Sequence, residues 1–326
     1  MPYFMIGTQR SGSNLLRIMI NQSPELVAPH PPHILERLGP LLPEYGNLEN
    51  PHAFAQLVDD VCTLVDTNPV SWHLGTIDRE KLAAKCSERS LVAINFEIHN
   101  LLAAQNGARS WVCKSLANVH YADEIDRFGG EQAKFIHLHR DGRDVALSFR
   151  KAIVGEKTAF HIAKQWRDEQ EKALALAAKL PANRVISVSY SNLVTDPRNE
   201  LTKLCDFMDV PFQEEMLEFQ KSREATDTSK AGKMWSNVQK PIMSENVKKF
   251  MGEMNRKDIA IFEAVAGETL TKLGYPLVSG FDEENARLKK YALEQADPAD
   301  LEKRKAQAGA MNEIKTRLMS RQSNVA

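Results

Sequence analysis

The part of this sequence best suited to chemistry is a short loop between a strand-like run and a helical pattern. The loop is Gly7–Asn14, and the apolar run before it begins at Tyr3. Backbone N–H groups at the start of a helix lack intrahelical partners and carry partial positive charge, so they attract an anion. Gly7 and Gly12 would let phosphate-like oxygens approach the backbone, and Arg10 adds a cation. Side chains that could bind the anion, or cap the helix instead, are Ser11, Ser13 and Asn14.

The same loop has the spacing of an ATP-binding P-loop but lacks one of its residues. That motif ends in Gly-Lys-Ser/Thr, and its lysine reaches the β- and γ-phosphates. Here Ser13 follows Gly12 directly, which suits a loop that holds one phosphate-like group. A kinase or NTPase remains an alternative, because Asp141 could imitate a magnesium-binding acid. However, Arg140 and Arg143 flank that carboxylate and favour anion binding.

A second anion-binding pattern follows the strand-like run Lys134–His139. It begins at Arg140, and Ser148 stands eight residues further on. A phosphate monoester dianion needs a guanidinium fork and a hydroxyl or backbone donor to replace its water, and this pair could supply both. The alternative is a structural ion pair between Arg140 and Asp144 at the end of the strand.

Two histidines lie in a proline-rich segment just after the first helix, Ala28–His33. An imidazole titrates at a pH of about 6.5, which suits a general base. In an extended segment alternate side chains share a side, so His33 and His30 are expected to face different sides unless the prolines turn the chain. Glu36 and Glu97 are further candidates for the base.

These stretches, taken in order, resemble the sulfotransferases that use 3′-phosphoadenosine-5′-phosphosulfate (PAPS). Residues 135–148 resemble the family's 3′-phosphate segment, with Gly142 in place of its usual proline, and Gly7–Asn14 resembles its 5′-phosphosulfate loop. Three further stretches resemble the strand before the catalytic lysine, a Tyr-containing turn and a basic loop over the nucleotide: Trp111–Ser115, Val188–Pro197 and Lys230–Trp235. The resemblance covers about residues 3–278. It is greater to bacterial and Golgi-type enzymes, including tyrosylprotein and carbohydrate sulfotransferases, than to the cytosolic phenol and steroid enzymes.

The resemblance implies roles for the residues that match. Arg10 and the loop would hold the 5′-phosphosulfate, and Arg140 with Ser148 would hold the 3′-phosphate. Lys114 would stabilise charge as the S–O bond breaks, with Arg10 also acting in catalysis. The nucleotide site would be completed by Tyr190, Lys233 and Trp235. PAPS would be the co-substrate, and no metal is expected.

The resemblance leaves the acceptor open. A small molecule, a carbohydrate or a peptide could each present the hydroxyl or amine that receives the sulfuryl group. Proline stands at residue 31, where some relatives have a glutamate base, so His33, ranked above His30, would take the proton. A module that binds the nucleotide without turnover is therefore a further alternative.

The order of elements predicts an α/β fold, with a P-loop-like parallel sheet flanked by helices and a helical C-terminal extension. Strands are predicted over residues 1–7, 111–113, 134–139 and 184–188. Helices are predicted over residues 13–22, 53–67, 90–105, 159–179 and 200–208. Pro29–Pro32 cannot form regular helix. Residues 1–278 would form the sulfotransferase domain.

Residues 279–326 are predicted to form a charged helical tail, which could also contact a second copy in a homodimer. The 326 residues carry a net charge of −1, which argues against a nucleic-acid partner. The four scattered cysteines suit a reducing compartment, and no apolar run reaches the roughly 20 residues that span a bilayer. No signal peptide is evident, so a cytoplasmic location is expected.

Overall fold

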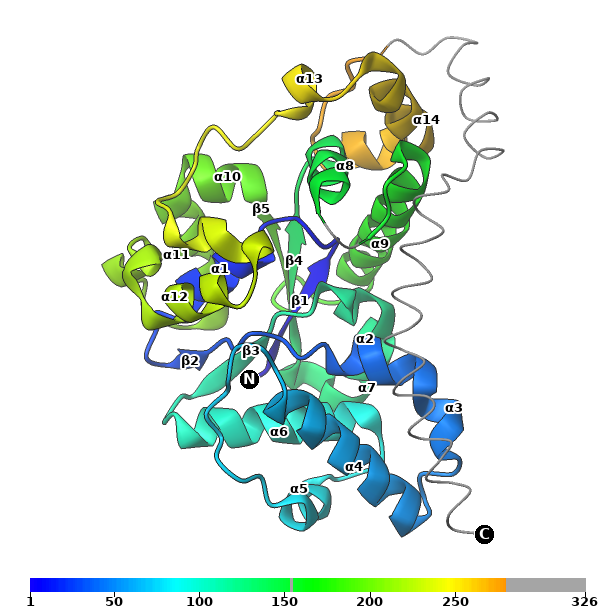
Figure 1. Ribbon diagram of the computed structural model, residues 1–326, viewed down its shortest axis with the longest axis vertical. Helices are drawn as coiled ribbons and strands as arrows, with labels where there is room; N and C mark the ends of the chain where they lie inside the picture. Colours follow the sequence, from blue (N-terminus) through cyan, green and yellow to red (C-terminus); the bar gives the residue numbers. More distant parts are fainter. Residues whose placement is uncertain (153–154, 280–326) are drawn as a thin grey trace.

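The centre of the molecule is a five-stranded sheet in which every pair of neighbours is parallel, in the order β2-β3-β1-β4-β5 (Figure 1). The computed structural model describes residues 1–152 and 155–279. The strands are β1 (Tyr3–Gly7), β2 (Leu26–Val27), β3 (Ser110–Cys113), β4 (Lys134–His139) and β5 (Val185–Ser189). The predicted parallel sheet is confirmed, and β2 is the strand that was not predicted. The predicted C-terminal extension lies outside the described residues, because residues 280–326 are not among them.

The central strand β1 separates two hydrophobic cores because its side chains alternate between the two faces of the sheet. Tyr3 and Met5 pack into one core, and Phe4 and Ile6 pack into the other; all four are buried. The first core is built from α1 (Ser13–Ile20) and α11 (Pro197–Met208). The second is built from α4 (Pro51–Asp66), α6 (Leu91–Gln105) and α7 (Ala122–Gly129).

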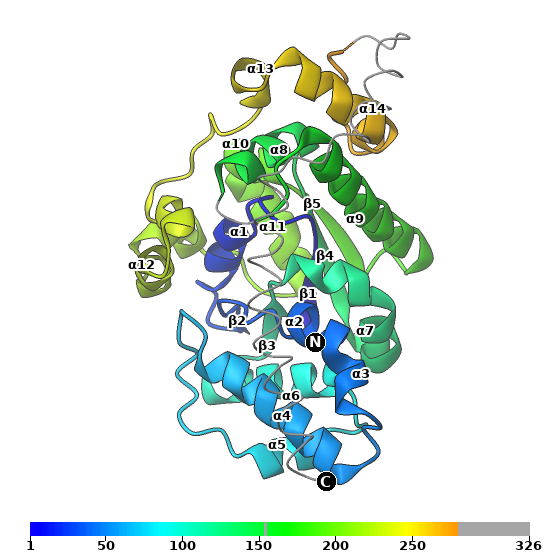
Figure 2. The same ribbon diagram turned by 45° about the vertical axis from the view of Figure 1, so that its right-hand side comes forward.

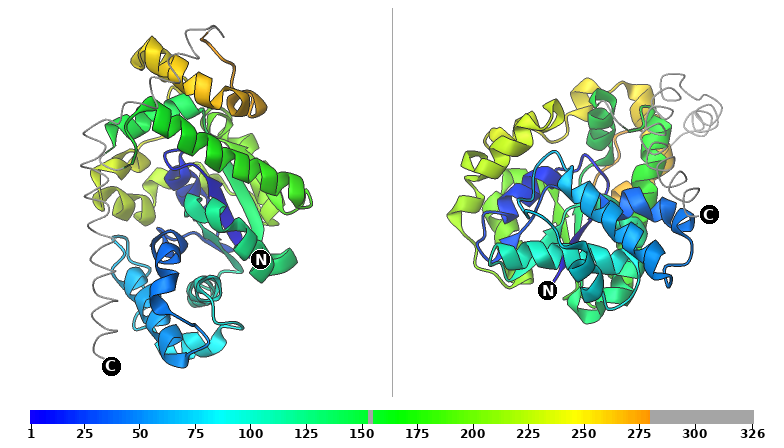
Figure 3. Two further views of the ribbon diagram at one scale, coloured as in Figure 1. Left: turned by 90° about the vertical axis from the view of Figure 1, so that its right-hand side faces the viewer. Right: turned by 60° about the horizontal axis from the view of Figure 1, so that its bottom comes forward.

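The five helices predicted between residues 13 and 208 are present, with small differences at their ends. Residues 29–32 are not helical, as predicted. Helix α1 ends at Ile20, two residues early, and α9 occupies Ala159–Lys179 as predicted. Helices that the sequence reasoning missed are α2 (Ile34–Leu38), α3 (Leu42–Tyr45), α5 (Arg79–Lys85), α8 (Gly142–Lys151), α10 (Tyr190–Thr195), α12 (Arg223–Lys230), α13 (Phe250–Glu253) and α14 (Arg256–Lys272). Helices α4 and α5 lie at one end of the molecule, opposite α13 and α14 (Figure 3).

A third core lies where α8 and α14 pack against α9 (Figure 2). It explains why glycine replaces the proline expected at residue 142. A Cβ on Gly142 would come within 2.4 Å of Phe262 and 2.7 Å of Trp166. The first residue of α8 therefore has no room for a side chain.

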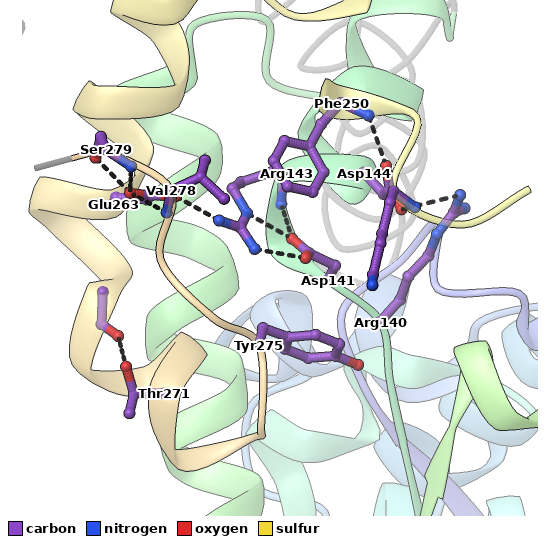
Figure 4. A network of polar contacts seen from close by, with 12 residues as sticks. Arg140, Asp141, Arg143, Asp144, Phe250, Glu263, Thr271, Tyr275, Val278 and Ser279 are labelled. Atoms are coloured by element: carbon purple, nitrogen blue, oxygen red, sulfur yellow. Dashed lines mark hydrogen bonds and ion pairs between the residues drawn. The ribbon is translucent and has the colours of Figure 1, made fainter. Parts of the chain in front are cut away.

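A buried ion network joins α8 to α14 beside this core (Figure 4). The guanidinium of Arg143 is bonded to both oxygens of Asp141, with Nε–Oδ1 at 2.9 Å and Nη2–Oδ2 at 2.7 Å, and also to Glu263. Glu263 further accepts from the backbone N–H groups of Val278 (3.0 Å) and Ser279 (2.8 Å). The network thus fixes the last described residues to the end of β4.

The carboxyl ends of parallel strands meet at one edge of the sheet, where α/β proteins bind ligands. Here β1 leads into the Gly7–Asn14 loop, β3 into Lys114, β4 into Arg140 and β5 into Tyr190. The fold therefore brings together residues separated by more than a hundred positions in the sequence.

Candidate active site

A cavity of about 1040 Å³ opens at this edge of the sheet. The predicted site residues that line it are Arg10, Gly12, Ser13, Asn14, His30, His33, Lys114, Arg140, Ser148, Tyr190 and Trp235. Ser11 is fully buried beside them in the loop. Lys233 begins the 3₁₀ helix η6 (Lys233–Gln239) that borders the cavity, but its side chain lies outside the described part of the chain. Glu97 lies on α6 away from the cavity and pairs with Asn100.

The Gly7–Asn14 loop has backbone angles that few residue types adopt. Gly12 caps α1 with a φ of 93°, and Arg10 is left-handed at 70°. No side chain caps the helix, so the suggestion that Ser13 or Asn14 does so is wrong. The cap leaves the first N–H groups of α1 without intrahelical partners, facing the cavity edge. A Cβ on Gly12 would lie 2.3 Å from the ring of Tyr190, which excludes other residues.

The start of the loop, at Thr8, is held by a chain of buried hydrogen bonds. Gln170 on α9 donates from Nε2 to Thr8 Oγ1 at 3.1 Å, and its Oε1 lies 2.7 Å from His137 Nε2. His139 is also buried, with Nδ1 2.7 Å from Tyr275 Oη. Both histidines of β4 therefore serve the fold and not the chemistry of the cavity.

Two arginines of the cavity lining lie close to each other. Arg10 Nε donates to Ser148 Oγ at 3.0 Å, and Arg140 Nη1 donates to the carbonyl of Arg10 at 3.3 Å. The Arg140 guanidinium also lies over the ring of Tyr190 at 4.4 Å. Burial, with the nearby charge of Arg140, lowers the pKa of Arg10. An anion between the two guanidinium groups would relieve this repulsion.

Several buried polar atoms at the same place have no partner within the described residues: Ser11 Oγ, Asn14 Oδ1 and Arg140 Nε. Buried polar atoms are normally hydrogen-bonded, because leaving one unpaired costs about 1–3 kcal/mol. The hydroxyl and the guanidinium can donate to phosphate or sulfate oxygens. The residues present therefore fit a phosphosulfate at the loop and a second phosphate at Arg140.

Asp144 is held by backbone groups and not by a close arginine. It accepts from the N–H groups of Lys248 (2.8 Å) and Phe250 (3.0 Å), and its Oδ2 is 4.0 Å from Arg140 Nη2 (Figure 4). The structural ion pair between Arg140 and Asp144 that was the alternative is therefore present, although the two atoms are 4.0 Å apart. The carboxylate also anchors the segment that lines the far side of the cavity, and Arg140 keeps donors free for a ligand.

The charges around the cavity are strongly unbalanced. Among the described lining residues, only two are carboxylates, Glu36 and Asp144. The cations are Arg10, Arg37, Lys114, Arg140, Lys151, Lys240 and Lys249. A concave site with this excess of positive charge attracts a polyanion, although the whole chain carries a net charge of −1.

Lys114 follows β3 directly and points its ammonium into the cavity lining. Burial, together with the positive charges of Arg17 and Arg10, lowers the pKa of Lys114 to about 7. An anion bound beside it would favour the charged ammonium again. The site thus holds a cation that a bound dianion can recharge.

His33 lies between a carboxylate and a hydroxyl. Its Nδ1 is 2.8 Å from Glu36 Oε2 and 3.0 Å from Ser115 Oγ. Burial lowers the pKa of His33, while Glu36 opposes this shift. Burial alone would raise the pKa of Glu36, but the hydrogen bond from His33 and nearby positive charge lower it overall. An ionised carboxylate can only accept, so its closeness to Nδ1 favours the tautomer with the proton on Nδ1, in which Nε2 is left to take another.

His30 also lines the cavity, so the expectation that it faces a different side from His33 is wrong. The reason is the backbone of His33, whose φ of 58° breaks the extended alternation. His30 Nδ1 lies 3.3 Å from Asn68 Oδ1, and its Nε2 has no partner within the described residues. Burial lowers the pKa of His30 to about 3, which makes it a weak base.

Two aromatic residues expected near the nucleotide have different surroundings. Tyr190 is buried between Gly12 and Arg140, and its hydroxyl accepts from Asn246 at 2.6 Å. Trp235 is partly exposed, and its ring meets that of His30 edge to face at 4.8 Å. Trp235 therefore presents more surface to a ligand than Tyr190 does.

Sequence reasoning did not identify two features of this site. Asp144, Leu147, Ser148 and Lys151 all line the cavity from one face of α8, and their spacing of three and four residues is a helical signal. His33 and Glu36 are also three residues apart, which is the spacing of a helical pair. Neither pattern was read as a helix, because Pro31–Pro32 and Gly142 interrupt the sequence there.

Neither a metal site nor a membrane-spanning helix is present in residues 1–152 and 155–279. No cluster of three or more His, Cys, Asp or Glu side chains there could hold a metal ion. Over the same ranges, no helix combines the length and the apolar character that crossing a bilayer requires.

Comparisons with known proteins identify the family of this chain. A model of the sulfotransferase family matches residues 2–214. The Caenorhabditis elegans protein named "Putative protein-tyrosine sulfotransferase" is 34% identical over 93 residues, which are 27% of this chain and 36% of that protein. The match thus spans about a third of the relative's length.

Two solved structures share the fold. The sulfotransferase domain of the Synechococcus PCC 7002 olefin synthase superposes with a TM-score of 0.61 and 25% identity, covering 85% of this chain and 96% of that domain. The sulfotransferase domain from the curacin biosynthetic pathway gives 0.58 and 21%, covering 85% and 98%. Since the family model matches well over half of the residues, the chain belongs to the sulfotransferase family.

Proposed function

We propose that this protein transfers a sulfuryl group from PAPS to a hydroxyl or amine of an acceptor. The observation that carries the proposal is the pair of guanidinium groups, Arg10 and Arg140, that line one cavity beside the unpartnered hydroxyl of Ser11. Two anionic groups on one ligand would satisfy both. Membership of the sulfotransferase family supports the same ligand.

The residues divide between the two ends of the donor. The loop amides, Arg10, Ser11 and Asn14 would hold the 5′-phosphosulfate, while Arg140 and Ser148 would hold the 3′-phosphate. The donor supplies the sulfuryl group: the acceptor atom forms a bond to sulfur while the bond to the phosphate oxygen breaks, and that electron pair leaves with the bisphosphate. The protein's part is to position the groups and to neutralise the charge that develops.

Lys114 and His33 would act at the reacting atoms. Lys114 Nζ would stabilise the charge that builds on the leaving oxygen. His33 Nε2 would take the proton from the acceptor while its Nδ1–H stays bonded. His33 suits this role better than His30, since Glu36 stabilises the imidazolium that forms and His30 has no such partner.

The nature of the donor can be tested by thermal unfolding. Adenosine 3′,5′-bisphosphate should raise the melting temperature, since ligand at 100 times its Kd stabilises a protein by about 2.7 kcal/mol. ATP with Mg²⁺ should stabilise much less, because the loop lacks the P-loop lysine. Equal or greater stabilisation by ATP would contradict the proposed donor.

A variant of Arg140 tests the binding of the 3′-phosphate separately from that of the 5′-phosphate. Arg140→Ala should weaken the binding of adenosine 3′,5′-bisphosphate by about 1.5–3 kcal/mol, the size of a charge-assisted hydrogen bond. The binding of adenosine 5′-monophosphate should stay nearly unaffected. Arg150→Ala is the matched control, because Arg150 lies on α8, the helix that follows Arg140, and pairs with Asp258 at the surface. Equal weakening of both nucleotides would make Arg140 a structural residue.

The contribution of Lys114 should be to turnover. Lys114→Met is expected to lower the rate of sulfuryl transfer by about 10²–10³, the usual cost of one charge-stabilising donor, with little change in donor affinity. The control is Lys134→Met, since Lys134 lies at the opposite end of the sheet and donates to the carbonyl of Phe207. A loss of binding with normal turnover would show that Lys114 only positions the donor.

The acceptor should be found by its product. Cell extract incubated with the protein and isotopically labelled PAPS would be searched by mass spectrometry for compounds that gain one sulfuryl group. Peptides containing tyrosine belong in the search, given the similarity to a protein-tyrosine sulfotransferase. Binding of the bisphosphate without any labelled product, including sulfate, would contradict an enzymatic function.

A further inference from the structure

The two oxygens of one carboxylate join the base to the donor loop. Glu36 Oε2 lies 2.8 Å from His33 Nδ1, and Glu36 Oε1 accepts from Gln9 Nε2 at 3.1 Å. Gln9 precedes Arg10 in the loop that follows β1, whereas Glu36 and His33 belong to the start of α2. One side chain therefore connects two elements that line the cavity.

Two residues near this contact have a strained, left-handed backbone, which surrounding contacts must stabilise. His33 has a φ of 58° and Arg10 has a φ of 70°, and such left-handed residues other than glycine cost about 1–3 kcal/mol each. Strain of this kind persists where surrounding contacts hold it, and it occurs often at functional sites. The Gln9–Glu36–His33 chain joins the two strained positions.

The carboxylate also decides which imidazole nitrogen carries the proton. The groups whose charges act on His33 are Glu36 and Arg37 on α2, Lys114 after β3 and His30 in the preceding segment. Among them only Glu36 is negative, and it contacts Nδ1. A carboxylate this close to Nδ1 favours the proton on that nitrogen, which leaves Nε2 unprotonated.

We propose that Glu36 is a positioning residue for the reaction: it fixes the tautomer and ring orientation of His33 and, through Gln9, ties the base to the donor loop. This rests on the proposed function only in naming His33 as the base. The acceptor proton moves to His33 Nε2 and stays there, while the Nδ1–H remains bonded to Glu36. Glu36 itself does not gain a proton.

The test uses the full chain with Glu36→Gln, which keeps the size and removes the charge. Nitrogen-15 NMR of the histidine side chains, assigned with His33→Asn, reports the tautomer and pKa of His33 without any turnover. Because Glu36 raises the pKa of His33, that pKa should fall in the variant, and the Nδ1–H tautomer should lose its dominance. Glu80→Gln, an exposed glutamate in the first turn of α5, is the control and should change neither.

Kinetics then show whether the contact matters for the reaction. Hydrolysis of PAPS, with water as the acceptor, should slow about 10- to 100-fold in Glu36→Gln, less than the general-base loss of about 10²–10⁴. The acidic limb of its pH–rate profile should move to lower pH, and affinity for adenosine 3′,5′-bisphosphate should stay within about twofold. Gln9→Leu, which keeps Glu36 and His33, should slow hydrolysis a few-fold.

The outcomes separate the two proposals. An unchanged tautomer and pKa of His33 in Glu36→Gln would overturn the role of Glu36, whatever the rate. A loss of bisphosphate affinity as large as the loss of rate would also overturn it, because Glu36 would then merely support the loop. A wild-type protein with the expected His33 tautomer but no PAPS turnover would leave the dyad standing and contradict the proposed function.

Discussion

His33→Asn is expected to lower the rate of sulfuryl transfer by about 10²–10⁴, the usual contribution of a general base. Asparagine is chosen because it tolerates the left-handed backbone of His33, so the start of α2 should survive. The acidic limb of the pH–rate profile should disappear, since it reports the protonation of the base. Affinity for adenosine 3′,5′-bisphosphate, measured by calorimetry, should not change.

The matched control is His73→Asn. His73 also has a left-handed backbone, with a φ of 54°, but it is exposed and does not line the cavity. Its replacement should leave the rate and its pH dependence as they are. If His30→Asn removes the acidic limb and His33→Asn does not, the base is His30 in spite of its burial.

Arg143→Met is expected to lower the free energy of unfolding by about 3–5 kcal/mol, because it leaves Asp141 and Glu263 as buried carboxylates without their cation. Arg143 is 1% exposed, so water cannot replace it. Urea denaturation followed by circular dichroism measures the change. Since Asp141 caps α8 and Glu263 holds Ser279, both ends of the network should loosen.

Arg150→Met provides the comparison, since Arg150 also links α8 to α14. Its partner is Asp258, and the guanidinium is 40% exposed. An exposed pair of this kind contributes about 0–1 kcal/mol, so the two variants should differ by several-fold in their effect. Similar losses in both would mean that the buried network contributes no more than a surface ion pair.

Much of the fold could be predicted because the apolar runs that form its centre are short and clearly bounded. The run from Tyr3 to Ile6 is buried on both faces, which leaves little choice but a central parallel strand. The loop after it was recognisable because Gly7 and Gly12 stand at its two ends. Lys114 and Arg140 could be placed because each follows a predicted strand.

The rest of the site depends on contacts that a linear pattern does not contain. Nothing local to Gly142 indicates that Phe262, far along the chain, would fill the space above it. Glu36 could be named as a candidate for the base, but its place beside His33 depends on Gln9 and on the turn at His33. These are tertiary effects, so periodicity and spacing could not predict them.

The central position of β1 has a consequence for how the chain is made. Tyr3 pairs with Val112 on one side, and Gly7 pairs with Leu138 on the other. At about 5–20 residues per second, a ribosome needs roughly 7–26 s between Gly7 and Leu138. For most of that time, until β3 is made, the apolar strand β1 has no neighbour to pair with, and such long-range parallel pairings also form slowly. We therefore expect the nascent chain to depend on chaperones, and the strand that carries the donor loop to wait longest for its place.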